Sequence, residues 1–320
     1  MNEYKYYIKK TEKPAFDVVV LELADFRGVP VFDFKPGQYV MIAYKNAQGR
    51  MQEKHTFSIA SSPLKKDSIR LGIRILGKFT TQLAQLPVGY EIFVSGPFGN
   101  FVFDEQQHGE AVFIAGGVGI TPFISSLAYA ADKQLVNRMD ILYSSRTLKG
   151  AVFADEIMDI ARKCDNIRSL ISITDETFER TPEHISTKRI GADAIGAFIG
   201  RTQGKTFFLC GPVSFMDAMR KNLAAIGVDE SQIRAEEFSM IPDTSLWLRV
   251  RNMTYALSLA AVLFVAILYA IRNVAQQRSI NSGSFLGVTN SSQTNTGTAN
   301  VSQTQQAPTT VLPSHRTRVS

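Results

Sequence analysis

The sequence FIAGGVGITP, residues 113–122, joins a β-rich run to a helical pattern through a turn that contains three glycines. Thr121 as the N-cap and Pro122 at the first helical position predict that the helix begins there. The backbone of the turn is open because Gly116, Gly117 and Gly119 have no side chains, and the dipole at a helix start favours anions. We therefore expect this turn to bind a pyrophosphate, although glycine turns between a strand and a helix also occur for packing alone.

Strand-like and helical runs alternate around this turn over residues 108–240. The strand-like runs are AVFIAG, MDILYSS, IRSLISI and KTFFLCG, and the helical patterns include TPFISSLAYAADK and SFMDAMRKNLAAIG. This alternation predicts a parallel α/β sheet, a common nucleotide-binding architecture. Residues 1–107 instead carry short β-rich runs broken by Gly and Pro, namely DVVVLEL, QYVMIAY, SIRLGIRIL and YEIFVSG. They predict an antiparallel sheet or barrel with a helical turn or two near residues 80–86.

The chain after residue 240 differs in composition from the two regions described above. Residues 253–271, MTYALSLAAVLFVAILYAI, contain no charge, and their length matches a bilayer core. They predict one transmembrane helix, with a buried core helix as the alternative. Residues 273–320 are rich in Ser, Thr, Asn, Gln and Gly, which predicts a disordered polar tail. Since the first residues show no apolar export signal, we expect a single-pass membrane protein with its N-terminal domains in the cytoplasm.

Composition narrows the function classes. The net charge of +6 and the pI of about 9.2 come from basic residues scattered among acidic ones, so we expect no nucleic-acid partner. The chain has only two cysteines, Cys164 and Cys210. They are too few to ligate an iron–sulfur cluster, and no haem-bearing helices or metal site are predicted.

Six motifs occur in one order over about residues 4–240. They are FKPGQYVMI with KHTFSIASSP, then GKFTTQL, GPFGNF, GGVGITP, CGP and IRAEEF. This series resembles the ferredoxin–NADP reductase superfamily. The resemblance implies an antiparallel FAD-binding β-barrel followed by an α/β NAD(P)-binding domain. It departs from the family at His55 and Phe57, where arginine and tyrosine are usual. That variant is similar to the NADPH oxidase and ferric reductase branch.

For FAD, the resemblance implies that Ser58 places its hydroxyl near flavin N5 and that Phe57 packs on the isoalloxazine ring or on the ribose. Phosphate contacts are expected from the start of a short helix, with added charge from Arg74. His55 has no permanent charge at neutral pH, so its phosphate contact is expected to depend on pH. The full set implied for FAD is His55, Thr56, Phe57, Ser58, Arg74, Gly77, Lys78, Phe79 and Thr80.

For NAD(P)H, the resemblance places Cys210 beside the nicotinamide ring, where it shapes hydride geometry; alone, it reads equally well as a small buried hydrophobe. Glu236 is expected to support proton movement, and Phe238 to shield the flavin. Arg146 with Ser145 favours the 2′-phosphate of NADPH over NADH, the alternative being a solvated loop arginine. The remaining implied contacts are Gly116, Gly117, Gly119, Ile120, Thr121, Pro122, Gly211 and Pro212.

The expected activity is hydride transfer from NAD(P)H to FAD, followed by electron transfer to a separate acceptor. Candidate acceptors are a ferredoxin or flavodoxin, a haem protein, a quinone or a flavin domain. Two alternatives remain: an electron-transfer subunit like those of the NADPH oxidase and ferric reductase branch, and a non-catalytic redox-sensing scaffold.

Overall fold

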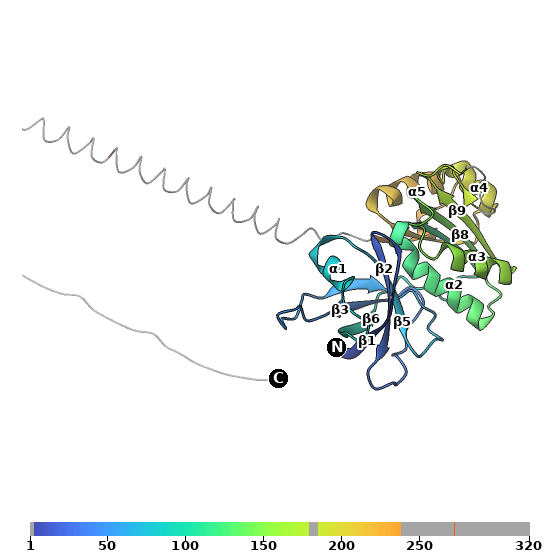
Figure 1. Cartoon of the computed structure of the whole chain (residues 1–320). Coiled ribbons are helices and arrows are strands. Elements are labelled where there is room, and N and C mark those ends of the chain that lie inside the picture. Colours follow the sequence, from blue (N-terminus) through green and yellow to red (C-terminus); the bar gives the residue numbers. More distant parts are fainter. Residues whose placement is uncertain (1–2, 179–184, 238–271, 273–320) are drawn as a thin grey trace, which may run out of the picture. The chain divides into compact units, whose positions relative to one another are not determined.

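The computed structural model describes residues 3–178, 185–237 and 272. The chain divides into two units, Met1–Met240 and Ile241–Ser320. The first unit contains two six-stranded sheets, and Figure 1 shows the elements of both.

The first sheet is antiparallel, in the order β4-β3-β6-β1-β2-β5. Its elements are β1 (Glu3–Ala15), β2 (Val18–Asp25), β3 (Tyr39–Ala43), β4 (His55–Ser58), β5 (Ile69–Arg74), α1 (Gly77–Leu83) and β6 (Glu91–Phe98). The two edge strands approach each other, because Ile59 forms a bridge with Leu71 and the Ala60 N–H donates to the Arg70 carbonyl at 2.7 Å. These contacts close the sheet into a barrel, so neither edge is left open.

Strand β2 shows why this segment forms a barrel wall. Val19, Leu21 and Leu23 alternate toward the barrel core, and all three are fully buried. The intervening Val18 and Val20 face outward and pack with Val152 of the second half. Both faces of the strand are thus apolar and covered, and β-branched residues suit that environment.

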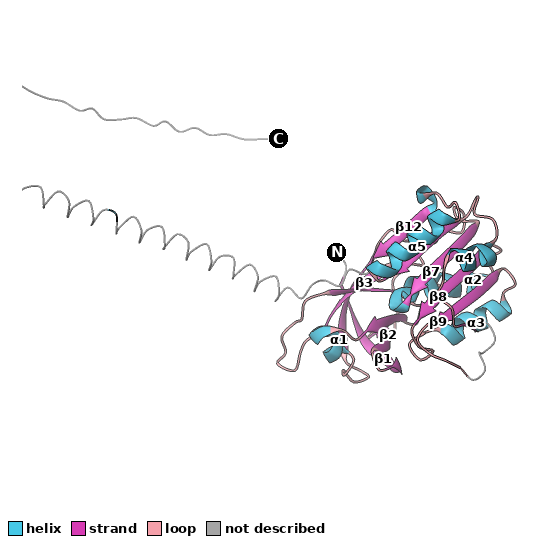
Figure 2. Cartoon of the chain, turned by 90° about the horizontal axis from the view of Figure 1, so that it is seen from above, coloured by secondary structure: helices cyan, strands magenta, loops and turns pink. Residues whose placement is uncertain are grey.

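The second sheet is parallel, in the order β10-β9-β8-β7-β11-β12. Figure 2 shows its strands side by side with helices along them. Its strands are β7 (Glu110–Gly116), β8 (Arg138–Ser145), β9 (Ile167–Ile173), β10 (Ile185–Ser186), β11 (Thr206–Gly211) and β12 (Ile233–Glu237). Its helices are η1 (Gly117–Ile120), α2 (Thr121–Lys133), α3 (Ala154–Lys163), α4 (Ala192–Ile199), α5 (Val213–Ala225) and η2 (Glu230–Gln232).

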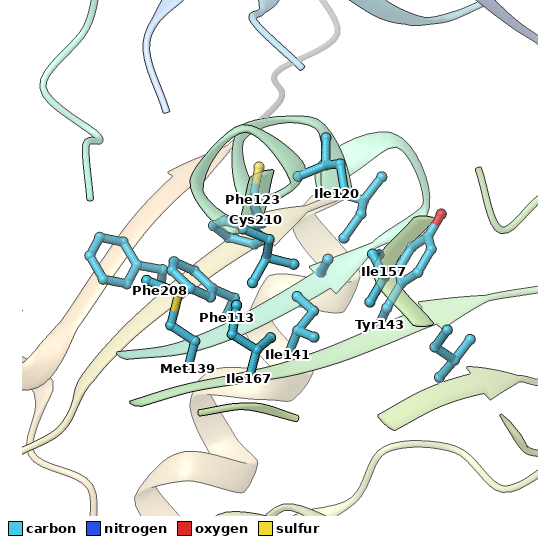
Figure 3. Close-up of a cluster of buried hydrophobic side chains, with 14 of the residues drawn as sticks. Phe113, Ile120, Phe123, Met139, Ile141, Tyr143, Ile157, Ile167, Phe208 and Cys210 are labelled. Atoms are coloured by element: carbon cyan, nitrogen blue, oxygen red, sulfur yellow. The ribbon is translucent and has the colours of Figure 1, made fainter. Parts of the chain in front are cut away.

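Helices cover both faces of the parallel sheet. On one face, Phe113, Ile141 and Phe208 pack with Phe123 of α2 and Ile157 of α3, and Figure 3 shows this cluster together with Cys210. On the other face, the alternate strand residues pack against α4 and α5. Burial on both faces explains why these strands are nearly continuous apolar runs.

The expected combination of an antiparallel and a parallel sheet is confirmed. Strand β1 was not predicted, because its charged residues hide the alternation in which Tyr6 and Ile8 face the barrel core. Within the described residues, no helix combines the length and apolar character needed to cross a bilayer. The predicted span, residues 253–271, and the predicted tail, residues 273–320, lie outside the described residues.

Candidate functional site

None of the five described α-helices has a side-chain cap at its start, and three of them also lack an acidic residue in the first turn. Helices α1, α2 and α5 have no side-chain cap and no acidic residue in the first turn. By contrast, α3 and α4 carry first-turn acids. The first N–H groups of a helix need acceptors, and an anion can supply them. The three helices without first-turn acids are those that the sequence motifs assign to the phosphates and the nicotinamide.

The glycine turn packs tightly against the end of strand β11. A Cβ atom on Gly119 would lie 2.4 Å from the carbonyl oxygen of Cys210, and one on Gly116 would lie 2.8 Å from the Phe215 ring. At Gly117, whose φ is +57°, a Cβ atom would meet nothing within 4 Å. Two of the three glycines are therefore needed for contacts within the protein, and Gly117 alone faces open space.

The predicted start of helix α2 was wrong by one residue. Ile120 is the N-cap, so Thr121 is the first helical residue and Pro122 the second. The 3₁₀ turn η1 leads straight into α2, which gives Ile120 a helical backbone conformation. The Thr121 hydroxyl donates to the Val118 carbonyl at 3.0 Å instead of accepting from the helix start.

Three aromatic rings lie in a row in the barrel. The rings of His55 and Phe79 stack with centroids 3.9 Å apart, and those of Phe57 and Phe79 lie 6.4 Å apart with the same 17° interplanar angle. Tyr44 also contacts Phe79: its hydroxyl donates to the Phe79 carbonyl at 2.9 Å, and the two ring centroids lie 4.9 Å apart. Burial lowers the pKa of His55, and Glu53 opposes this only in part. His55 is therefore mainly neutral at neutral pH.

The residues of β4 that are expected to contact FAD lie on two opposite faces of the strand. Successive residues of β4 point to opposite faces, so Thr56 and Ser58 face away from the stacked rings. Ser58 is only 3% exposed. The two hydroxyls are thus on the face opposite to His55 and Phe57.

Helix α1 offers fewer free side chains than expected. Phe79 is buried in the barrel core. The Thr80 hydroxyl accepts from the Leu76 N–H and donates to the Leu76 carbonyl, both at 2.7 Å. Lys78 is exposed, and Arg74 lies 3.3 Å from the Asp17 carboxylate. Gly77 has φ +79° and open space where a Cβ would be. Lys78 and the helix-start N–H groups are therefore the groups here most available to an anion.

Cys210 and Glu236 are neighbours at the carboxyl end of the parallel sheet. They are paired residues of β11 and β12, which places their side chains on the same face. Burial raises the pKa of Glu236 from its ordinary 4.5 to about 7, and Glu236 Oε2 has no hydrogen-bond partner among the described residues. Burial, with a smaller effect of Glu236, raises the pKa of the Cys210 thiol well above its usual value. Cys210 thus stays protonated, while Glu236 can gain or lose a proton near neutral pH.

The predicted ribose site includes a carboxylate that the sequence did not single out. Arg146 is 82% exposed, and its Nε lies 3.9 Å from Asp175 Oδ2. The Asp175 N–H donates to the Arg146 carbonyl at 2.9 Å, and the Ser145 hydroxyl donates to the Thr147 carbonyl at 3.1 Å. Asp175 follows β9, the neighbour of β8, so only the strand order brings it to Arg146.

The structure brings together three groups of the predicted residues. The glycine turn meets Cys210 and Gly211, Cys210 meets Glu236, and His55 and Phe57 meet Phe79. Gly211 is close-packed too, since a Cβ atom there would lie 2.8 Å from the Phe215 ring, and Pro212 is the N-cap of α5. Phe238 lies outside the described residues.

These features fit FAD and NAD(P)H. Uncapped helix starts and the open space at Gly77 and Gly117 suit phosphate groups, and no first-turn acid would repel them. Lys78, Arg74 and the start of α1 would hold the FAD phosphates, and the turn before α2 would hold the NAD(P)H pyrophosphate. Cys210, Gly211 and Glu236 would then border the nicotinamide.

Domain comparisons agree with this assignment. The family described as the oxidoreductase FAD-binding domain matches residues 6–103, and the oxidoreductase NAD-binding domain matches residues 113–221. The reductase component of propane 2-monooxygenase from Rhodococcus jostii (strain RHA1) is 28% identical over 240 residues, covering 72% of this chain and 62% of that protein. The flavohemoprotein of Bacillus subtilis (strain 168) is 27% identical over 248 residues, covering 76% and 61%.

Solved structures show the same fold. The flavohem-like FAD/NAD-binding domain of nitric oxide dioxygenase from Vibrio cholerae O1 biovar El Tor aligns with a TM-score of 0.64 at 22% identity, over 73% of this chain and 98% of that chain. A ferredoxin NADP+ reductase from Neisseria gonorrhoeae with bound FAD and NADP aligns with a TM-score of 0.62 at 16% identity, over 74% and 99%. The chain covers about three fifths of the two sequence relatives described above. It is an oxidoreductase that carries an oxidoreductase FAD-binding domain followed by an oxidoreductase NAD-binding domain.

Proposed function

We propose that the chain takes a hydride from NAD(P)H onto FAD and passes the electrons to a separate acceptor. The observation that carries this proposal is the contact between Gly119 and Cys210, with Glu236 paired beside Cys210. It joins the turn suited to a pyrophosphate to the strand end that borders the nicotinamide. Ligands of open α/β sheets bind at this carboxyl edge.

Bound FAD supplies the capacity to accept a hydride and to release electrons singly. The residues of the chain then have three tasks. Cys210 limits the space beside the nicotinamide, and it acts as a neutral thiol because its pKa is raised. Glu236, with a pKa of about 7, holds or releases a proton at the same edge. Ser58, which lies on the face of β4 opposite to His55 and Phe57, would place a hydroxyl donor near flavin N5.

The preferred donor remains NADPH, on the strength of Arg146. An exposed guanidinium next to Ser145 suits the dianionic 2′-phosphate. Asp175 acts in the opposite direction, since a carboxylate at this position can accept a hydrogen bond from the 2′-hydroxyl of NADH. The Arg146–Asp175 pair therefore sets a preference that a single substitution could move either way.

The acceptor is proposed to be a second protein or a quinone. Support comes from relatives named as reductase components, of which the propane 2-monooxygenase protein is one. The paired His55 and Phe57 favour a second candidate, an electron-transfer subunit like those of the NADPH oxidase and ferric reductase branch. We further propose that the two domains lie in the cytoplasm and that residues 253–271 anchor them to a membrane, since this segment has no charged residue.

The test is reduction of the purified full-length chain. A yellow preparation whose flavin absorbance falls on anaerobic addition of NADPH or NADH is the expected result, and oxidised NADP+ in place of NADPH is the control. A colourless preparation that neither binds added FAD nor oxidises NAD(P)H would instead support the non-catalytic scaffold.

A further inference from the structure

Arg70, on barrel strand β5, reaches into the nucleotide-binding domain. Its Nη2 donates to Glu156 Oε1 on helix α3 at 2.8 Å, and its Nε donates to the Ala60 carbonyl of the barrel at 3.0 Å. The guanidinium carbon lies 4.8 Å from the ring centroid of Phe153, the residue that caps α3. The side chains of Arg70 and Glu156 are 28% and 32% exposed, so the pair is largely shielded from water. A planar guanidinium can make all of these contacts at once, which an ammonium cannot.

The backbone around Arg70 is fitted to this contact. Phe153 has φ +68°, an uncommon conformation for a bulky residue. Gly72, two residues along β5, lies so close to the other domain that a Cβ atom would come within 2.7 Å of Thr121 Cγ2 and 3.2 Å of the Phe153 ring. Strained conformations persist where the surroundings fix them, and they cluster at functional positions.

The segment that Arg70 holds is the continuation of the flavin-binding strand. The Arg70 N–H donates to Ser61 Oγ at 3.1 Å, and the Arg70 carbonyl accepts from the Ala60 N–H at 2.7 Å. The Ser61 carbonyl accepts from the buried Ser125 hydroxyl of α2 at 2.7 Å. Residues 58–61 are therefore tied to α2 directly and to α3 through Arg70. Helix α2 begins at the glycine turn, so these contacts connect Ser58 with the proposed NAD(P)H site.

We propose that Arg70 is a positioning residue for hydride transfer, holding the nucleotide-binding domain against the flavin barrel through Phe153 and Glu156. This inference rests on the proposed transfer from NAD(P)H to FAD. Hydride transfer needs the donor and acceptor atoms in near-contact, and a displacement of about 1 Å can cost about a hundredfold in rate. Arg70 touches neither reactant; it acts by fixing the two half-sites relative to each other.

The decisive variants are Arg70→Met, which keeps the length but removes the guanidinium, and Arg70→Lys, which keeps the charge but cannot stack and bridge together. The matched control is Arg162→Met. Arg162 also pairs with an acid, but that acid is Asp159 of the same helix, so no contact between domains is lost. Each full-length variant is measured for FAD affinity by flavin fluorescence, for NADP+ affinity by difference spectroscopy, and for flavin reduction at saturating NADPH by stopped flow. Reduction by 4-deuterated NADPH gives the isotope effect.

We expect Arg70→Met to slow flavin reduction by about tenfold or more and to raise the isotope effect, with both affinities within about threefold of wild type. Arg70→Lys and Glu156→Gln should be intermediate, and Arg162→Met should match wild type. The charge exchange Arg70→Glu with Glu156→Arg should recover part of the rate lost in Arg70→Glu. If Arg70→Met does not fold, Arg70→Lys and Glu156→Gln provide the same comparison.

Wild-type reduction rates in variants with lowered melting temperatures would overturn the proposal, because Arg70 would then serve stability alone. A loss of FAD affinity with an unchanged rate would overturn it as well. Failure of the wild-type chain itself to be reduced would instead count against the proposed function, so the two failures are distinguishable.

Discussion

Glu236 has a buried carboxyl oxygen, Oε2, that has no hydrogen-bond partner among the described residues. Its neighbour on β11, Cys210, carries a thiol, which is only a weak hydrogen-bond donor. The Glu236 pKa of about 7 follows from burial alone. A carboxyl group that is partly protonated at neutral pH can exchange a proton with a bound reactant. The same burial makes Glu236 a source of pH-dependent instability, which can be measured without any cofactor.

Replacing Glu236 by Gln should remove a loss of stability that sets in as pH rises. Glu236 titrates near 4.5 when unfolded and near 7 when folded, so the folded state binds the extra proton between these values. Stability therefore falls as pH rises from about 4.5 to about 7, by at most about tenfold in the unfolding constant per pH unit. The measurement is urea denaturation of both proteins at several pH values between 5 and 8.

Comparing Glu236→Gln with wild type isolates the contribution of Glu236 to the pH dependence of stability. Burial lowers the pKa values of His55 and His108, so their contribution has the opposite sign: stability is lost as pH falls below about 6.5. Both histidines are present in wild type and in Glu236→Gln, so their contribution cancels in the difference. A constant difference across the pH range would show that Glu236 titrates normally.

The donor preference can be tested at Arg146 and Asp175 separately. Arg146→Ala should raise the KM for NADPH by about tenfold or more and leave that for NADH nearly unchanged, because only NADPH loses a charge-assisted phosphate contact. Asp175→Asn should have the opposite effect, favouring NADPH by removing a carboxylate next to the phosphate. Lys149→Ala, an exposed lysine nearby, controls for general charge. Equal changes for both donors would remove the NADPH assignment.

Among the structural elements, the glycine turn contributes to packing within the protein as well as to the expected pyrophosphate site. Gly119 approaches the backbone of β11 more closely than any side chain permits, which holds the start of α2 against the carboxyl end of β11. A helix start presents its N–H groups usefully only if its position is fixed. The close packing of Gly119 therefore prepares the site before any cofactor binds.

Gly119→Ala should test this packing. The added methyl would lie 2.4 Å from the Cys210 carbonyl oxygen, so backbone atoms must move. Overpacking of this kind costs about 1–3 kcal/mol, and we expect the unfolding free energy to fall by that amount and NADP+ affinity to fall with it. The control is Gly109→Ala, where nothing lies within 4 Å and φ is not positive. Its effect should stay within about 0.5 kcal/mol. Equal stabilities of the two variants would contradict the packing role.

Sequence patterns predicted elements better than they predicted contacts. The apolar runs located β2, β7 and β11, because each strand must bury at least one face. The contact of Gly119 with Cys210 could not be predicted, since it depends on how η1 packs against β11. Asp175 was missed for a similar reason: it reaches Arg146 only through the order of β8 and β9. Ile120 shows the limit of capping rules, because a 3₁₀ turn can lead into a helix without a polar cap.

In the molecule as a whole, the packing contacts between the barrel and the parallel sheet could not be predicted from the sequence. Val18, Val20 and Phe153 lie far apart in sequence and pack in one cluster. Ala60 of the barrel belongs to the core of the nucleotide-binding half. The two domains are therefore expected to unfold together, although each has its own family signature.

The orientation of residues 253–271, the proposed membrane anchor, follows from where NAD(P)H is found. A reductase that uses NAD(P)H needs its nucleotide site in the compartment that holds these donors, and basic residues flank the apolar segment about equally on both sides, so charge does not decide its direction. We expect the N-terminal domains to face the cytoplasm and the residues after 273 to lie on the far side. Epitope tags placed before Met1 and after Ser320 report both ends when protease is added to intact cells or spheroplasts.

The C-terminal tag should be cut and the N-terminal tag should survive, because only the former is exposed to the protease. Lysed cells, in which both tags should be cut, show that each site is susceptible. Protection of both tags in intact cells would contradict a single span, and release of the whole chain by alkaline carbonate would contradict the membrane helix. An inverted pattern would place the NAD(P)H site outside the cytoplasm. That outcome would contradict the proposed location while leaving flavin reduction by NAD(P)H in the purified chain to be judged separately.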